Sequence, residues 1–210
     1  MTASRVVKVG GSLLDWPELP AALNRWLAAQ PPACDILVCG GGLLTDAIRA
    51  ADRRFQLGEE QAHWLCIDAL AVSARLLAAL LPSASLCGDF RFLAARSRTG
   101  PPSRVVFDAG EFLRRHEPAL PGTPIPHSWS ATTDSIAARL ASVLVADELV
   151  LLKSADPPAL PAAADWAAAG YVDAHFPVAA GGLGRVRAVN LRQPSRPEVV
   201  LTCARAAGRC

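Results

Sequence analysis

Two lysines and two groups of glycines are the residues of this sequence whose types and spacing suggest chemistry. Lys8 stands in "VVKVGGSLL", where β-branched residues give way to Gly10, Gly11 and Ser12, and three more glycines at 40–42 follow the apolar run "CDILVC". Glycine lets the backbone approach a ligand closely, and its N–H groups can point at phosphate oxygens. The pattern therefore predicts phosphate binding at two strand ends, although it matches neither GxGxxG nor GxxxxGK[ST].

Lysine is rare in this chain. Of its 21 basic residues only two, Lys8 and Lys153, are lysines, and Lys153 lies in "LVLLKSAD", where a strand-like run passes into a loop. An ammonium group is a compact point donor and a guanidinium is a wide planar fork, so the two do not exchange freely at a tight phosphate site. Both lysines are therefore candidates for catalysis, and the alternative is that two surface lysines persist by chance.

Asp134 is the third candidate. In "SATTDSIAARLA" we expect Thr132 and Thr133 to cap a helix that begins near Asp134 and holds its carboxylate in the first turn. A carboxylate held in this way could lie between the two lysines and orient both ammonium groups. An ordinary helix start explains the residue equally well.

Strand-like and helical segments alternate along the chain. Apolar, β-branched runs predict strands at 5–9 and within 34–42, 103–110, 148–156, 185–191 and 197–203. Helical spacing predicts helices within 15–30, 43–55, 58–81 and 111–117 and from about 134, and 154–170 is predicted to be a loop with a short helix. We therefore expect a single α/β domain over 1–210, a three-layer α/β/α sandwich with a mostly parallel central sheet.

Composition narrows the functional classes. The formal charge of +2, from 21 basic and 19 acidic residues, gives no electrostatic case for nucleic acid or for an anionic membrane. We find no signal peptide and no window of about 18 uncharged apolar residues, so a cytoplasmic location is expected. Six cysteines include no CxxC pair, and four stand in apolar runs, which predicts buried hydrophobic residues rather than metal ligands or disulfides.

The segments "KVGGSLL", "GGG", "TTDSIAARLA" and "LLKSAD" resemble, in order and spacing, the amino acid kinase family, from residue 5 to about 201. This resemblance implies a kinase that uses ATP and Mg²⁺ to phosphorylate a small acceptor. The segments "HSWSATTDSIA" and "AHWLCIDALA" are similar to the subgroup that converts 5-(aminomethyl)-3-furanmethanol phosphate to its diphosphate in methanofuran biosynthesis. A phosphorylated small molecule is thus the expected partner, and the sequence allows a homo-oligomer without specifying one.

The resemblance also implies roles for individual residues, with acceptor binding in about 1–128 and nucleotide binding in about 129–210. The implied catalytic residues are Lys8, Asp134 and Lys153. The implied nucleotide and phosphate contacts are Gly10, Gly11, Ser12, Thr133, Ser154, Asp156 and Tyr171. The implied acceptor contacts are Gly40, Gly41, Gly42, Asp46, His63 and Trp129. No metal ligand is assigned to the protein.

Several of these assignments have alternatives. His63 on a long apolar helix and Trp129 could be packing residues, and Asp46 could form a surface ion pair with Arg49, one helical turn away. An acceptor with an amine would require a nearby carboxylate, for which Asp46 and Asp68 are the candidates.

The chain also departs from the family pattern. Pro157 and Pro158 follow Asp156 where relatives commonly have Asp-Gly, and "AAGGLGRVRAVN" offers Gly181, Gly182 and Gly184 but no lysine. Several kinases of the family place a lysine of this late glycine-rich loop on the phosphates. In this chain either Lys153 takes that role or catalysis is weakened. The alternatives are therefore a kinase for isopentenyl phosphate or a carboxylate, and a non-catalytic nucleotide-binding regulatory or storage protein.

Overall fold

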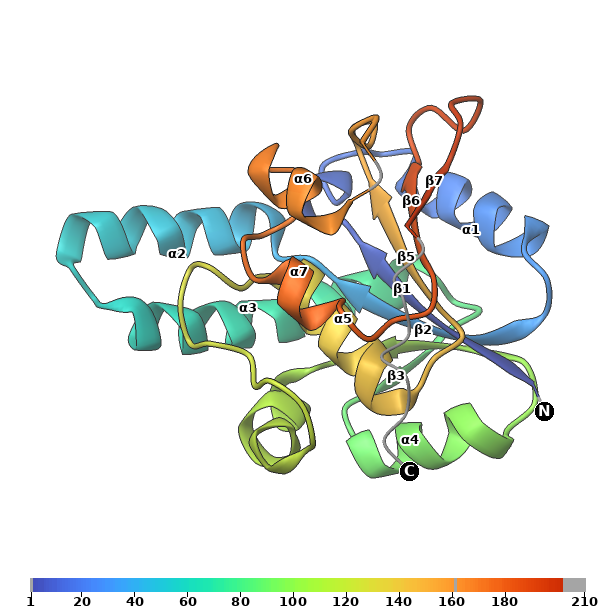
Figure 1. Ribbon diagram of the computed structural model, residues 1–210, viewed down its shortest axis with the longest axis horizontal. Coiled ribbons are helices and arrows are strands. Elements are labelled where there is room, and N and C mark those ends of the chain that lie inside the picture. Colours follow the sequence, from blue (N-terminus) through green and yellow to red (C-terminus); the bar gives the residue numbers. More distant parts are fainter. Residues whose placement is uncertain (1, 161, 202–210) are drawn as a thin grey trace.

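A single seven-stranded sheet forms the centre of the protein in a computed structural model that describes residues 2–160 and 162–201 (Figure 1). The strands are β1 (Ala3–Val9), β2 (Ala33–Cys39), β3 (Ser85–Cys87), β4 (Ser103–Phe107), β5 (Glu148–Lys153), β6 (Val186–Asn190) and β7 (Val199–Leu201). They lie in the order β3-β4-β2-β1-β5-β6-β7, and all neighbours are parallel except β6 and β7. The predicted mostly parallel α/β fold is confirmed.

The helices connect these strands. They are α1 (Leu19–Ala29), α2 (Gly42–Phe55), α3 (Glu59–Leu80), α4 (Phe90–Thr99), α5 (Thr133–Leu144), α6 (Ala163–Ala168) and α7 (Phe176–Ala179), with short turns η1 (Gly11–Leu13), η2 (Phe112–His116) and η3 (Glu117–Ala119). The predicted helix at 111–117 is a π-helical turn, η2, followed by a 3₁₀ turn. β3 and α4 were not predicted, because β3 is a largely exposed three-residue edge strand and α4 buries only Phe90, Leu93 and Ser97.

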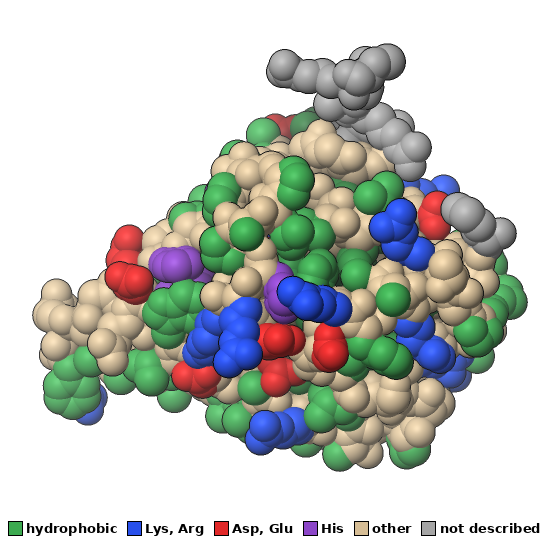
Figure 2. Space-filling model, turned by 90° about the horizontal axis from the view of Figure 1, so that it is seen from below, with side chains coloured by type: hydrophobic (Ala, Val, Ile, Leu, Met, Phe, Trp, Pro, Cys, Tyr) green, Lys and Arg blue, Asp and Glu red, His purple; other side chains and the backbone are tan. Residues whose placement is uncertain are grey.

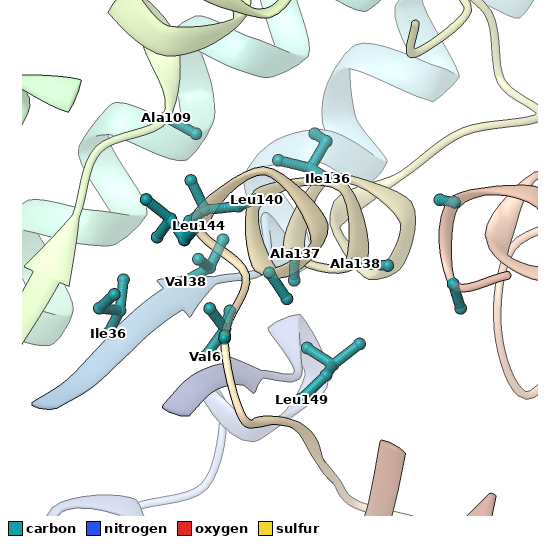
Figure 3. Close-up of a cluster of buried hydrophobic side chains, with 14 of the residues drawn as sticks. Val6, Ile36, Val38, Ala109, Ile136, Ala137, Ala138, Leu140, Leu144 and Leu149 are labelled. Carbon is teal, nitrogen blue, oxygen red and sulfur yellow. The ribbon is translucent and has the colours of Figure 1, made fainter. Parts of the chain in front are cut away.

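Alternate residues of the central strands enter two separate cores. Val6, Ile36 and Leu149 pack with α5 on one face (Figure 3), whereas Val7, Leu37 and Val150 pack with α1 on the other. Successive side chains of a strand point to opposite faces, so a strand buried on both faces must be apolar throughout. This is the physical reason that β1, β2 and β5 read as continuous apolar runs, and it confirms the three-layer arrangement.

Helices α2 and α3 form an antiparallel pair that extends from the body of the molecule (Figure 1). No residue of α2 is buried, while α3 buries residues such as Ile67 and Leu77 in the two cores. By length and composition, α3 is the one helix of the described segments that could cross a membrane, a test that core helices also pass. Basic and acidic side chains are interspersed on the face shown in Figure 2, in keeping with the small net charge.

The cysteines follow the prediction in part. Cys34 and Cys39 are buried, Cys66 and Cys87 are half-buried, and all four are free thiols. Cys203 and Cys210 lie outside the described residues.

Parallel strand direction decides which residues meet. The carboxyl ends of β1, β2 and β5 lie at one edge of the sheet. Lys8 and Lys153 are among the last residues of β1 and β5, and the two glycine groups directly follow β1 and β2. Such edges are where open parallel sheets bind ligands. Gly181, Gly182 and Gly184 precede β6, so they lie toward the opposite edge and do not reach this region.

Candidate active site

Lys8, Lys153 and Asp134 form a buried ion cluster at the carboxyl edge of the sheet. Lys8 Nζ lies 2.9 Å from Asp134 Oδ1, and Lys153 Nζ donates to Asp134 Oδ2 at 2.8 Å. The lysines come from the neighbouring strands β1 and β5, and Asp134 comes from the first turn of α5. All three side chains are largely buried, with exposed fractions of 8%, 13% and 6%. One carboxylate thus holds two ammonium groups, one on each oxygen.

Charge pairing sets the protonation of this cluster. Burial alone would raise the pKa of Asp134, but the charges of Lys8 and Lys153 outweigh it and hold the pKa below its usual value. Burial, together with the like charge of Lys8, lowers the pKa of Lys153 to about 8, although Asp134 acts in the opposite direction. The cluster therefore carries a net positive charge at neutral pH, in surroundings where charge interactions are strong.

The N-terminus of α5 is held by Asp173, not by the threonine side chains that we expected to cap it. Thr132 occupies the cap position, but its backbone N–H and Oγ1 both donate to Asp173 Oδ2 at 2.9 Å, and Ser135 N donates to the same oxygen at 3.0 Å. Ser135 Oγ donates to Asp173 Oδ1. A carboxylate at a helix N-terminus satisfies free N–H groups and matches the helix dipole. Asp173 thereby fixes the turn that presents Asp134.

Tyr171 lies against Lys153. The ammonium of Lys153 donates to the backbone carbonyl of Tyr171 and lies 4.8 Å from the centre of its ring. Burial raises the pKa of the Tyr171 phenol, and its buried hydroxyl has no hydrogen-bond partner among the described residues. Tyr171 thus helps to position Lys153, and its expected contact with a nucleotide stays a prediction.

The two glycine turns pack backbone against backbone. A Cβ on Gly11 would lie 2.3 Å from the nitrogen of Gly42, and a Cβ on Gly40 would lie 2.5 Å from the nitrogen of Gly11. Any larger residue would push the turns apart, and Gly42 has a positive φ of 52° that also favours glycine. Close packing of the two turns is therefore one reason that they need glycine, in addition to the phosphate binding predicted from the sequence.

Beside this junction, polar groups gather at the ends of β1, β5 and β6. The hydroxyl groups of Ser12 and Ser154 are 2.8 Å apart. Asp156 is exposed and accepts a hydrogen bond of 2.7 Å from the side chain of Asn190, the last residue of β6. Asn190 was not predicted, and the signal that identifies it is the one that identified Lys8, a polar residue at the carboxyl end of a buried strand.

A small cavity of about 60 Å³ lies between α2, α3 and the segment that leads into α5. Trp129 and Arg49 form one wall, where the guanidinium lies 4.7 Å from the centre of the indole ring and Asp52 accepts a 2.8 Å hydrogen bond from Trp129 Nε1. The other lining residues are Thr45, His63, Cys66, Ile67, Leu70, Ser128, Ala131, Thr132, Thr133 and Ile136. The cavity therefore adjoins the start of α5 that carries Asp134.

His63 is a buried wall of this cavity, and its Nε2 has no hydrogen-bond partner among the described residues. Its ring stacks on His127 at 4.9 Å and meets Trp64 edge-on at 5.0 Å. Burial and the neighbouring His127 lower the pKa of His63 to about 4, so the imidazole is neutral at physiological pH. A neutral ring with one free nitrogen can hydrogen-bond a bound molecule.

Asp46, Asp68 and the glycines at 40–42 do not line this cavity. Asp46 is exposed, forms a 3.0 Å ion pair with Arg49 and does not line the cavity, as expected of a surface pair. Asp68 pairs with Arg114 at 2.6 Å, also outside the cavity. The glycines at 40–42 do not line the cavity either, because they form the turn into α2, whose next turns supply Thr45 and Arg49.

Within residues 2–160 and 162–201 there is no group of three or more His, Cys, Asp or Glu side chains that could hold a metal ion. The donor set present, two ammonium groups and glycine-rich backbone, suits phosphate oxygens. A magnesium ion would therefore fit this site mainly through the phosphates of a bound nucleotide.

Comparison with known proteins identifies the family. The family model described as "Amino acid kinase family" matches residues 4–157. A uridylate kinase of Haloquadratum walsbyi is 34% identical over 159 residues, which are 72% of this chain and 58% of that protein. The chain thus spans less than two thirds of the length of this relative.

Solved structures support the fold. The uridylate kinase of Archaeoglobus fulgidus matches with a TM-score of 0.51 and 23% identity over 74% of this chain and 64% of that one. The aspartate kinase of Synechocystis has a TM-score of 0.67 at 16% identity, over 99% of this chain and 41% of that one. The UMP kinase of Bacillus anthracis also has a TM-score of 0.67, at 11% identity over 97% of both chains. With the family model matching most of its length, this chain belongs to the amino acid kinase family.

Proposed function

We propose that this protein is a phosphotransferase that moves the γ-phosphoryl group of ATP to a small phosphorylated acceptor. The observation that carries the proposal is the buried cluster of Lys8, Asp134 and Lys153 beside two glycine-rich turns. Membership of the amino acid kinase family and the similarity to uridylate kinases support it.

The geometry suits phosphoryl transfer, which depends on alignment and on neutralising charge rather than on covalent catalysis. Lys8 and Lys153 bind oxygens of the migrating group, and Asp134 holds both ammonium groups in place through its separate oxygens. The backbone N–H of Gly11 binds the phosphates of the donor, whereas the N–H of Gly10 already donates to the carbonyl of Leu152 at 2.8 Å. Magnesium, when bound with the nucleotide, supplies further neutralising charge.

The cavity beside α5 is the proposed acceptor site. Its volume of about 60 Å³ is small beside the roughly 300–1,000 Å³ of pockets for drug-sized ligands, so it can enclose only part of a phosphorylated acceptor. Trp129 offers a flat face, His63 a free nitrogen and Arg49 a cation for a phosphate. These features support 5-(aminomethyl)-3-furanmethanol phosphate as the acceptor that we propose.

Two observations are the reason for testing other acceptors as well. Neither Asp46 nor Asp68 lines the cavity, so neither offers a carboxylate there to the amine of the furan compound. The relatives are uridylate kinases, so uridine monophosphate joins isopentenyl phosphate and a carboxylate as alternatives.

The deciding experiment incubates the protein with Mg-ATP and each phosphorylated acceptor, and follows the products by mass spectrometry and phosphorus NMR. We expect formation of the furan diphosphate with a stoichiometric amount of ADP. Preferential product formation from uridine monophosphate or isopentenyl phosphate would overturn the acceptor and keep the reaction. Tight ATP binding with no ADP formed from any acceptor would favour the non-catalytic alternative, to which the Pro157–Pro158 pair after Asp156 already points.

A further inference from the structure

Arg192 lies against the glycine-rich turn that follows β1, although 180 positions separate it from Ser12. Its Nη2 donates to the backbone carbonyl of Ser12 at 3.1 Å, and its guanidinium lies 5.6 Å from the centre of the Trp16 ring. The sheet order explains the contact, because β6 lies next to β5 and β5 next to β1. Arg192 therefore reaches the phosphate turn from the far side of the strand that bears Lys153.

Asn190 anchors the turn that carries this arginine. Its buried side chain accepts a 3.1 Å hydrogen bond from the backbone N–H of Arg192 and donates to Asp156. The next residue, Leu191, donates from its backbone to the carbonyl of Lys153 at 2.9 Å. The start of the turn is therefore fixed relative to β5, and Arg192 leaves it in a defined direction.

The guanidinium of Arg192 is exposed and has no carboxylate partner within residues 2–160 and 162–201. Among the described residues no acidic side chain lies within 4.0 Å of it, and its one hydrogen bond is to Ser12, which leaves most of its five N–H donors free. Arg5, Arg139 and Arg187, by contrast, each pair with a glutamate or an aspartate. A guanidinium held against the turn at residues 10–12, where the hydroxyls of Ser12 and Ser154 also lie, can bind phosphate oxygens.

The net charge of the lysine cluster leaves a need for a further cation at this site. Lys8, Lys153 and Asp134 together carry only one net positive charge, whereas a nucleoside triphosphate and a phosphorylated acceptor together bring several negative charges. The glycine-rich stretch before β6 cannot supply a cation to this edge, because it lies toward the other end of the strand.

We propose that Arg192 is a phosphate-binding residue that lies against the turn at residues 10–12 and binds the phosphate chain of the donor nucleotide. This inference rests on the proposed function and names a binding residue beyond it. Because Arg192 binds phosphates rather than the base or sugar, its contribution grows with the number of phosphates on the ligand.

The test measures nucleotide binding without turnover, by titration calorimetry in the absence of acceptor. We compare ATP with AMP for the unaltered protein and for Arg192→Gln, Arg192→Lys and Arg185→Gln. Arg185 is a matched control, an exposed arginine near the opposite end of β6 that pairs with Glu148. We expect Arg192→Gln to raise the Kd of ATP by about 10–100-fold, as loss of a charge-assisted phosphate contact predicts, and that of AMP by less than about threefold.

Arg192→Lys should keep part of the affinity for ATP, and Arg185→Gln should keep all of it. An equal loss of ATP and AMP affinity, or an unchanged Kd for ATP in Arg192→Gln with an unchanged melting temperature, would overturn the inference. Failure of the unaltered protein to bind ATP would overturn both this inference and the proposed function. Normal ATP binding and turnover in the unaltered protein, with no effect of Arg192→Gln, would overturn the inference alone.

Discussion

Two ion networks lie at opposite ends of the same strands, and they are built from different cations. At the amino edge of the sheet, Arg5 of β1 bonds Asp35 of β2 at 2.9 Å and lies 3.3 Å from Glu148 of β5. At the carboxyl edge, Lys8 of β1 and Lys153 of β5 share Asp134. Arginine builds the first network and lysine the second.

The networks also differ in how completely their donors are used. Arg5 bonds the carbonyl of Pro31 in addition to its carboxylates, and Glu148 further pairs with Arg185 and Arg187. In the lysine cluster, by contrast, two ammonium groups share one carboxylate. Apart from the buried Nε of Arg187, which has no partner among the described residues, the arginine network uses its donors on its own carboxylates and carbonyls, whereas the lysine cluster keeps donors and positive charge for a ligand. In a chain with 19 arginines, both lysines stand at the second site.

The largest effect should follow from Asp134→Asn, because it leaves two buried ammonium groups without a carboxylate. We expect turnover to fall at least about 100-fold, and the free energy of unfolding to fall by about 3–5 kcal/mol. Coupled ADP-release assays and urea unfolding measure the two quantities. Turnover within about tenfold of the original value would show that Asp134 does not organise the lysines for catalysis.

Lys8→Arg tests whether the carboxyl edge requires lysine. The wider guanidinium keeps the charge but displaces the donor atoms, so we expect turnover to fall about 100-fold while the melting temperature stays within a few degrees. Steady-state kinetics and thermal unfolding check this. Near-normal activity with normal melting would mean that the distinction between the two edges is not functional.

The lowered pKa of Lys153 predicts a pH dependence. The ammonium is protonated below about pH 8 and loses its charge above it, so kcat/KM for ATP should fall up to about tenfold per pH unit above pH 8. Bound phosphates favour the charged form, so the fall in kcat should begin at a higher pH. A pH–rate profile from pH 6 to 10 measures both parameters. A kcat/KM that stays flat to pH 10 would contradict the assignment of Lys153 to phosphate binding.

The smallest effect on catalysis should come from Arg5→Lys, the reverse exchange at the amino edge. A lysine cannot bond Asp35, Glu148 and the carbonyl of Pro31 together, so we expect the free energy of unfolding to fall by about 1–3 kcal/mol with turnover unchanged. Urea unfolding and the kinetic assay provide the measurements. A loss of turnover comparable to that of Lys8→Arg, at unchanged stability, would show that the amino edge also contributes to catalysis.

The sequence determined the fold class and much of the site. The apolar runs of β1, β2 and β5 are apolar throughout because both faces of these strands are buried, and this pattern is visible without a structure. Parallel strand direction placed Lys8 and Lys153 at the same edge of the sheet, and the pairing of β1 with β5, which the sequence did not show, brought the two lysines together. The edge strand β3 was missed because a short, exposed strand leaves no such pattern.

Only the tertiary structure decided which groups complete the site. Asp173, rather than the side chain of Thr132, accepts the hydrogen bonds at the N-terminus of α5. The fold brings this carboxylate, 41 positions away in the sequence, within 2.9 Å of the backbone nitrogen of Thr132. Arg192 meets Ser12 through packing that no local pattern encodes, whereas the ion pair of Asp46 with Arg49 was visible in the sequence as a spacing of one helical turn. Local sequence fixes the type of element and its buried faces, but contacts between distant turns depend on strand order, which emerges only when the whole sheet forms.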